Sequence, residues 1–313
     1  MHRLCSLALV PIIGFQVTAQ FRVVAGGEGV SKGRLEAVAA LLEAGLARLV
    51  RDVPGTPTRE ILAVVHRSAS SIPTELLSSL HAGVPGFARL QHDEIHLVMD
   101  QIGIEPPNDL RTTVVHELVH VLLDQTVGQN GLSVPRWFHE GLAQVLSEGL
   151  YLGVREEDLM YRAWNRSYIP FRDLAQGFPE QPSELALAYG QSFSFVAFLR
   201  DEVGLPVLIE AAKACGPERS FRSELALRLG AGVVVYEDQW LDHILKSGAG
   251  WRALLRNCFM FTVIPAFILL AIAVARRRNR EELVKQRMED EESAEQSAED
   301  WDAEEFGQRE DEW

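Results

Sequence analysis

Residues 110–127 read LRTTVVHELVHVLLDQTV, and residues 135–143 read PRWFHEGLA. The first stretch has apolar residues at helical spacing and predicts one helix, which contains His116 and His120. Side chains four residues apart project from one face of a helix, one turn above the other, so both imidazoles can reach a single ion. Glu117 lies on the adjacent flank, where a carboxylate can take a proton from a water that the ion holds.

The histidine pair predicts a third ligand further along the chain, because a catalytic zinc ion takes three protein ligands and keeps a fourth position open. The second stretch begins another helix and offers two candidates, His139 and Glu140, of which only one can face the ion. Glu140 can do so if the two helices pack antiparallel. A third ligand six residues after His120 is excluded because Thr126 occupies that position. Asp124, one turn beyond His120, is predicted to orient one of the metal ligands without itself binding the ion.

The motif HELVH followed by WFHEGLA resembles the gluzincins, and most closely the bacterial peptidase MA-like domain family. The resemblance extends over about residues 90–205, and the spacing from the second histidine to the glutamate is similar to that of thermolysin. It implies a gluzincin-like zinc peptidase fold and favours Glu140 over His139. The roles that it implies are Zn²⁺ ligands for His116, His120 and Glu140, and general base for Glu117.

A further match is the segment AYGQS at residues 188–192, which is predicted to open a helix. In gluzincins that resemble the M1 aminopeptidases, a tyrosine in this place donates a hydrogen bond to the oxyanion, which implies that role for Tyr189. A tyrosine of the core or of a helix cap is the alternative. Those aminopeptidases also carry a Gly-x-Met-Glu-Asn segment that grips a substrate amine. The segment EIHLVM at residues 94–99 lacks it, which favours an endopeptidase.

The motifs together predict a zinc metallopeptidase, a hydrolase that acts on a peptide or protein substrate. The alternative is a catalytically silent peptidase-like domain that serves as a binding or scaffolding module. A net charge of −14 argues against nucleic acid as a partner, since binding to phosphates needs basic patches. The remaining histidines of the N-terminal half are interpreted as surface or strand residues without ligand spacing: His66, His81, His92 and His96.

The two ends of the chain predict a membrane protein with its main domain outside the cytoplasm, in the periplasm or the extracellular space. Residues 1–19 have the order of a signal peptide: a basic start, an apolar run and small side chains before a cleavage site after Ala19. Residues 257–275 are uncharged and long enough for one transmembrane helix. Because Arg276–Arg278 follow directly, the C-terminus is expected in the cytoplasm and the helix in the lipid bilayer.

The C-terminal tail, residues 276–313, has 7 Lys and Arg against 15 Asp and Glu. Its first part is expected to extend the helix, and the part beyond Met288 is predicted to be disordered because it lacks apolar surface. A solvated spacer is the simpler interpretation of the tail, and a docking site for a cytoplasmic partner is the alternative.

Residues 20–250 are predicted to form one extracytoplasmic α+β domain, with a small β-containing N-terminal half and a helical C-terminal half. Cys215 is the one cysteine of this domain, so no disulfide is expected within it. Strands are expected near residues 21–24, 60–66, 87–90 and 94–99. Helices are expected near residues 32–53, 73–81, 110–127, 135–149, 183–203, 206–214, 221–229 and 237–246.

Overall fold

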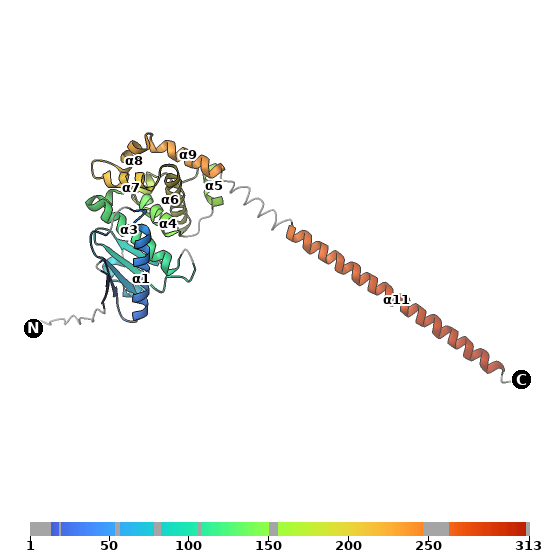
Figure 1. Cartoon of the computed structure of the whole chain (residues 1–313). Helices are drawn as coiled ribbons and strands as arrows, with labels where there is room; N and C mark the ends of the chain where they lie inside the picture. Colours follow the sequence, from blue (N-terminus) through green and yellow to red (C-terminus); the bar gives the residue numbers. More distant parts are fainter. Residues whose placement is uncertain are drawn as a thin grey trace, which may run out of the picture. The chain divides into compact units, whose positions relative to one another are not determined.

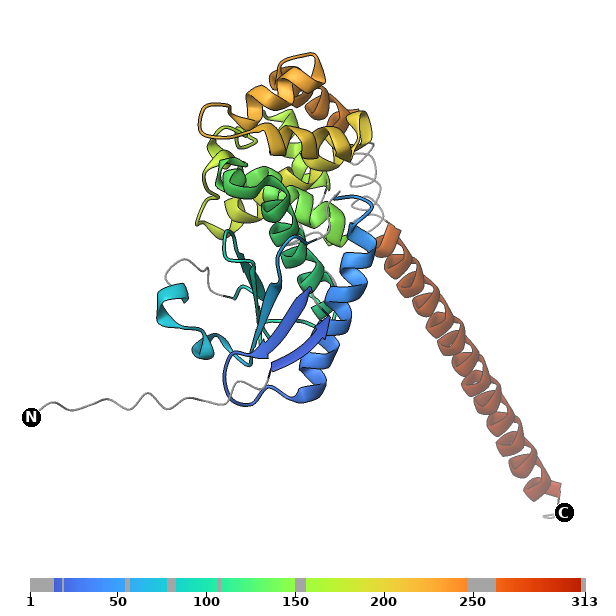
Figure 2. The same cartoon turned by 60° about the vertical axis from the view of Figure 1, so that its left-hand side comes forward.

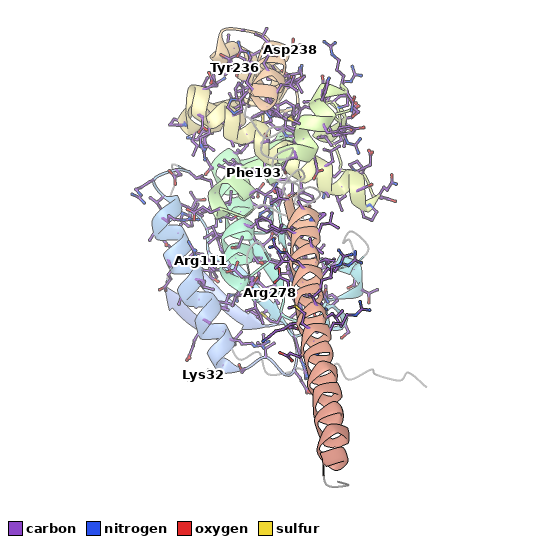
Figure 3. All side chains as sticks on the ribbon, turned by 90° about the vertical axis from the view of Figure 1, so that its right-hand side faces the viewer. Lys32, Arg111, Phe193, Tyr236, Asp238 and Arg278 are labelled. Atoms are coloured by element: carbon purple, nitrogen blue, oxygen red, sulfur yellow. The ribbon has the colours of Figure 1, made fainter. Side chains whose placement is uncertain are left out.

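A computed structural model describes residues 14–18, 20–53, 57–77, 83–105, 108–149, 156–246 and 263–310. The chain divides into two compact units, Met1–Ala249 and Gly250–Trp313. The first unit has its strands and helix α1 at one end and helices α6–α9 at the other, with α3 and α4 between them (Figure 1). In Figure 3, Lys32 and Tyr236 lie at these opposite ends. The arrangement confirms an α+β domain.

The N-terminal half contains a five-stranded sheet with the strand order β1-β2-β3-β5-β4. Its strands are β1 Gly14–Thr18, β2 Phe21–Ala25, β3 Ile61–His66, β4 Gly86–Arg89 and β5 Glu94–Val98. Strands β2, β3 and β5 are parallel, whereas β1 and β4 pair antiparallel at the two edges. Along β3, alternate side chains (Ile61, Ala63 and Val65) are fully buried, as the period-2 pattern of a strand requires. Edge strand β4 borders the candidate site.

Two long helices, α1 and α3, pack on the sheet and bury its apolar side chains. Helix α1 (Lys32–Leu49) begins at Ser31, whose hydroxyl accepts a hydrogen bond from the backbone N–H of Arg34, and it packs on β2 and on α3 (Leu110–Val127). Helix α3 also contacts β4 and β5, and Figure 2 shows it passing from the sheet into the helical half. The helix that carries both predicted histidines is therefore the central element of the domain.

The C-terminal half consists of helices packed on α3 and on one another (Figure 2). Helix α4 (Arg136–Ser147) contacts both α3 and α6 (Pro182–Val203). Aromatic side chains fill the space around the start of α4: Trp137 and Phe138 pack against Phe171, Phe195 and Phe221. The remaining helices of this half are α5 Glu156–Trp164, α7 Leu205–Ala214, α8 Phe221–Leu229 and α9 Val233–Lys246. The short helical turns of the whole domain include η1 Ala69–Ser71, α2 Thr74–Leu77, η2 Gly128–Ser133 and η4 Asp173–Ala175.

The structure differs from the sequence-based expectations at the N-terminus. Gly14–Thr18, which belong to the predicted signal peptide, form strand β1 and pair with β2. Residues 1–13 and 19 lie outside the described part of the chain, and cleavage after Ala19 stays a prediction. Helix α5 was also not expected: only two of its apolar residues, Leu159 and Ala163, are buried, while Tyr161 and Trp164 are exposed.

The second unit contains helix α11, Ile264–Glu310. The prediction of disorder beyond Met288 is therefore wrong for residues up to Glu310. The segment is rich in Glu, Ala, Gln and Arg, which favour helix without any core, and ion pairs such as Arg277–Glu281 link successive turns. Residues 257–262 of the predicted membrane span lie outside the described residues. Within the described ranges, no helix has both the length and the apolar character needed to cross a membrane.

Candidate active site

His116 and His120 face one another from successive turns of α3. Their Nε2 atoms are 3.2 Å apart and their ring centroids 4.9 Å apart. The helix has defined ends, because the Asp109 carboxylate accepts a hydrogen bond from the backbone N–H of Thr112 (3.1 Å), and Gly128 follows the last turn with φ 72°. The two imidazoles share one face of α3, as the sequence predicts.

Glu140, one turn after the start of α4, completes a cluster with the two histidines. Its Oε2 lies 3.5 Å from Nε2 of His116 and 3.6 Å from Nε2 of His120. Zinc bonds of about 2.0–2.1 Å in a tetrahedral arrangement separate neighbouring ligand atoms by about 3.3–3.4 Å, so these spacings fit such an ion. Among the described residues this is the one group of three His, Cys, Asp or Glu side chains that can hold a metal ion.

His139, the rival candidate for third ligand, lies beside the cluster and outside it. Its ring centroid is 5.8 Å from that of His120, and its Nε2 lies 3.4 Å from the carbonyl oxygen of Gly131. Burial, together with repulsion from His120, lowers the pKa of His139 to about 4. His139 is thus a neutral buried residue that borders the cavity beside the ligands and is not one of them.

The position of Glu140 depends on how closely α4 approaches α6. A Cβ atom on Gly141 would lie 2.5 Å from the backbone oxygen of Ser192 and 2.6 Å from a methyl group of Val196. Only glycine therefore allows this approach without a shift of one helix. The glycine after the glutamate in the second motif has a packing role, which brings Glu140 and α6 to the same cleft.

Glu117 is buried next to the histidines, with 6% of its surface exposed. Its carboxylate accepts a hydrogen bond from the backbone N–H of Ala88, on edge strand β4. A Cβ on Gly86 of that strand would lie 3.2 Å from Cγ of Glu117, so the strand passes close above α3. Burial raises the pKa of Glu117, and the nearby His116 and His120 oppose that shift. A carboxylate with a raised pKa is suited to accept and return a proton.

Glu140 and His120 stabilise one another's charged forms. Burial alone would raise the pKa of Glu140, but hydrogen bonds from His116 and His120 hold it well below its usual value. Burial would likewise lower the pKa of His120, yet the contact with Glu140 raises it. A cation placed between the three ligand atoms would replace the proton, so metal binding at this site is expected to release protons and to weaken at low pH.

Tyr189 lines the same cleft, but it does not lie at a helix start, which corrects the expectation from the AYGQS match. Helix α6 begins at Pro182, so Tyr189 is about two turns inside it. Its ring packs edge-on against Phe178, with centroids 5.0 Å apart, and its backbone oxygen accepts a hydrogen bond from Nε2 of Gln144 (3.0 Å). Gln144 thereby ties α4 to α6 at the level of the cleft.

Asp124 does not orient a metal ligand, which corrects the sequence-based prediction. Its two carboxylate oxygens accept hydrogen bonds from the backbone N–H and the side-chain amide of Gln91, both at 2.7 Å. Gln91 and Asp93 have positive φ angles of 64° and 55° and form the tight link between β4 and β5. Asp124 therefore holds this turn on α3 and, through it, the edge strand that borders the site.

A cavity of about 780 Å³ opens onto the cluster, a size within the usual range for ligand sites. Its lining comes from β4, from α3, and from the loop and helix that carry Val134, Arg136 and Glu140. Arg136 has no predicted role from the sequence motifs, although its i, i+4 spacing to Glu140 places the two side chains on one face of α4. Its Nε lies 3.7 Å from Oε1 of Glu140, whereas the histidines approach Oε2 of the same carboxylate.

Two histidines of the sheet form a buried pair away from the cluster. His66 ends β3 and His96 lies in β5, so both are strand residues, as expected, but neither is on the surface. Their rings stack with centroids 5.3 Å apart, and Nε2 of His66 lies 3.0 Å from Nδ1 of His96. His92 borders the cavity, and His81 lies outside the described residues.

Residues 93–244 match the family model described as the Peptidase MA superfamily. This stretch is a little under half of the chain, and it contains all three residues of the cluster together with Glu117 and Tyr189. A solved structure similar to the chain is that of a mutant M1 zinc metallopeptidase from Deinococcus radiodurans. The two are 15% identical with a TM-score of 0.34, and the match covers 74% of this chain and 50% of that one.

The chain thus spans about half the length of that structure. No curated protein matches the chain.

The buried Cys215 remains a free thiol, as expected, and its Sγ donates to the carbonyl oxygen of Ala212.

Proposed function

We propose that the protein is a zinc-dependent peptidase whose site is the cluster of His116, His120 and Glu140. The observation that carries this proposal is the spacing of the three ligand atoms, 3.2–3.6 Å, with the Glu117 carboxylate buried beside them. A zinc ion held there would polarise a substrate carbonyl and lower the pKa of a water molecule. The match of residues 93–244 to the Peptidase MA superfamily supports hydrolysis of peptides or proteins.

The surrounding residues would divide the remaining tasks. Glu117 takes the proton from the attacking water and passes it to the leaving amine, a role that its raised pKa supports. Tyr189 donates a hydrogen bond to the oxyanion that develops on the carbonyl. Edge strand β4 borders the cavity, and no strand of the described residues pairs with its outer side, so an extended peptide can lie against it.

The carboxylates of the cleft support an endopeptidase rather than an aminopeptidase. Among the described residues that line the cavity, only Glu117 and Glu140 carry a carboxylate, and both have roles at the reacting group. A grip on a substrate amine would need a third. The lining also includes Leu132, which is exposed, so a peptide can reach the cleft from solvent.

The test compares the full chain with its Glu117→Gln variant, which keeps the shape and the hydrogen-bonding reach of the side chain but cannot take a proton. We expect both proteins to bind about one zinc ion. Cleavage of an unstructured peptide should fall by about 10²–10⁴-fold in the variant. Equal zinc-dependent cleavage by the two proteins would show that Glu117 is not the base, whereas no zinc-dependent cleavage by either would favour a silent binding or scaffolding module.

We also propose that the protein is anchored in a membrane by residues 257–275, with the peptidase domain outside the cytoplasm. The uncharged run, the Arg276–Arg278 cluster after it and the N-terminal signal-like segment support this topology. A protease added outside spheroplasts should degrade residues 20–250 and spare the acidic tail, where a cytoplasmic partner could bind. Protection of the domain with digestion of the tail would reverse the assignment.

A further inference from the structure

We infer that Arg136 is a substrate-binding residue that holds a carboxylate of the peptide close to the bond that is cut. This inference rests on the proposed peptidase function and specifies the class of substrate. The carboxylate can belong to the C-terminus of the peptide or to an Asp or Glu side chain. The two sources share the same chemistry at the guanidinium, and the experiment below distinguishes them.

The guanidinium of Arg136 is held in place from two directions. Its Cζ lies 4.9 Å from the centroid of the Phe178 ring, and its Nε lies 3.7 Å from Oε1 of Glu140. Phe178 is itself fixed, because it is buried and packs edge-on against Tyr189. A planar guanidinium stacked on an aromatic ring presents its N–H groups in a fixed fork that matches a carboxylate. Arg136 is therefore preorganised for an anion.

The donor capacity of Arg136 is largely unused within the described part of the chain. Its one ion-pair partner there is Glu140, at a distance longer than a hydrogen bond. The side chain is 35% exposed and lines the cavity, so a ligand in the cleft can reach it. A guanidinium has five N–H donors, and an incoming carboxylate can accept two of them at once.

The charge balance changes in favour of an anion when the site is loaded. Without a metal, the Glu140 carboxylate is the acidic group shared by the two histidines and Arg136, at 3.5–3.7 Å from each. Once Glu140 binds a dication through Oε2, its charge is committed to that cation, and Arg136 remains as an uncompensated positive group in a partly buried cleft. A substrate carboxylate would restore the balance.

The other cation of the cleft does not compete for this role. Arg89 lines the cavity from β4, but it forms an ion pair with the neighbouring Glu94. Arg136 is consequently the cation of the described cleft that lacks a dedicated acidic partner. Arg136 lies one helical turn from Glu140. Its guanidinium can therefore contact a substrate residue about one or two positions from the bond that is cut.

The experiment measures binding of three fluorescent hexapeptides of alanine and phenylalanine to the zinc-loaded full chain carrying Glu117→Gln. One peptide has an amidated C-terminus and no acidic residue, the second has a free C-terminus, and the third is amidated with one internal Asp. We expect the second, the third or both to bind about 10- to 100-fold more tightly than the first, as a charge-assisted pair provides. Adding Arg136→Met should abolish that difference and change the affinity for the neutral peptide by less than about threefold.

Two matched variants make the result specific. Arg136→Lys keeps the charge and should retain part of the preference, whereas Arg89→Met should retain all of it. Zinc content, measured in every variant, separates loss of the subsite from loss of the metal. Equal weakening of all three peptides by Arg136→Met, or loss of the preference in Arg89→Met but not in Arg136→Met, would overturn the inference.

The carboxylate subsite and the peptidase function can each be wrong while the other is right. If the wild-type chain cleaves the neutral peptide as efficiently as the two acidic ones, the peptidase function stands and the carboxylate subsite is wrong. If the chain binds acidic peptides through Arg136 but cleaves none of them, the subsite stands and the peptidase function is wrong.

Discussion

Gly141 lies against Ser192 so closely that a Cβ atom on the glycine would be 2.5 Å from the serine carbonyl oxygen. This contact joins α4, which carries Glu140, to α6, which carries Tyr189. The backbone oxygen of Ser192 belongs to a helix and cannot move independently of it. The geometry of the cleft therefore depends on the absence of one side chain, and this dependence can be tested directly.

Gly141→Ala is expected to push α4 away from α6, because two backbones cannot relax as a side chain can. Overpacking of this kind costs about 1–3 kcal/mol of unfolding free energy, and the displaced Glu140 should also weaken zinc binding. Denaturant unfolding and zinc titration measure the two effects. Gly33→Ala, in α1, is the control, since a Cβ there meets no atom within 4 Å. Similar stability of the two variants would show that the helices can separate at little cost.

Glu140→Gln is expected to weaken zinc affinity by more than the roughly 10- to 100-fold that loss of an outer hydrogen-bond partner causes. The amide is neutral and has lost the charge that faces the two imidazoles. His116→Ala and His120→Ala should abolish binding, since each removes one of three ligands. His139→Ala should leave zinc affinity nearly unchanged, because its ring hydrogen-bonds Gly131 and not the cluster. Loss of zinc from the His139 variant with retention by the Glu140 variant would reverse the assignment of the third ligand.

Tyr189→Phe is expected to lower kcat by about 10²–10³-fold while zinc content and stability stay close to wild type. The ring would still pack against Phe178, so the substitution removes only the hydroxyl. If the role of Tyr189 is structural, kcat should instead remain within a few-fold of wild type. Steady-state kinetics on an unstructured peptide, together with thermal unfolding, decide between these outcomes.

The His66–His96 pair is expected to make the domain less stable at mildly acidic pH. Burial, followed by repulsion from His96, lowers the pKa of His66 to about 4, whereas an unfolded histidine titrates near 6.5. The unfolded chain therefore binds a proton that the folded chain does not, and the free energy of unfolding falls as pH falls from about 6.5 to about 4. At higher pH both states are neutral and this contribution is fully present.

The loss is expected to be on the order of 1–3 kcal/mol across that interval. Urea unfolding at pH 7 and pH 5 measures it, with a chelator present throughout so that release of metal does not contribute. His66→Gln cannot take up a proton and should show a smaller decrease than wild type. Other groups with lowered pKa values, His96 and His139, would retain their share. An unchanged pH dependence in the variant would contradict the prediction.

Local patterns determined much of this protein. The histidine pair and Glu117 follow from helical periodicity within a single segment, so their relative placement needs no knowledge of the fold. Helix α3, strand β5 and helix α8 lie within a residue or so of the ranges that spacing and caps predict. The α+β class follows from the same patterns, since each element buries its own apolar face.

Tertiary packing decided what the patterns left open or placed wrongly. Whether His139 or Glu140 faces the histidines depends on the rotation of α4, which its contacts with α3 and α6 set. Asp124 pairs with Gln91, far from it in the sequence, because the turn between β4 and β5 folds back over α3. His66 and His96 meet because β3 and β5 are neighbours in the sheet. Such contacts join residues tens of positions apart, and side-chain periodicity carries no information about which distant surfaces will meet.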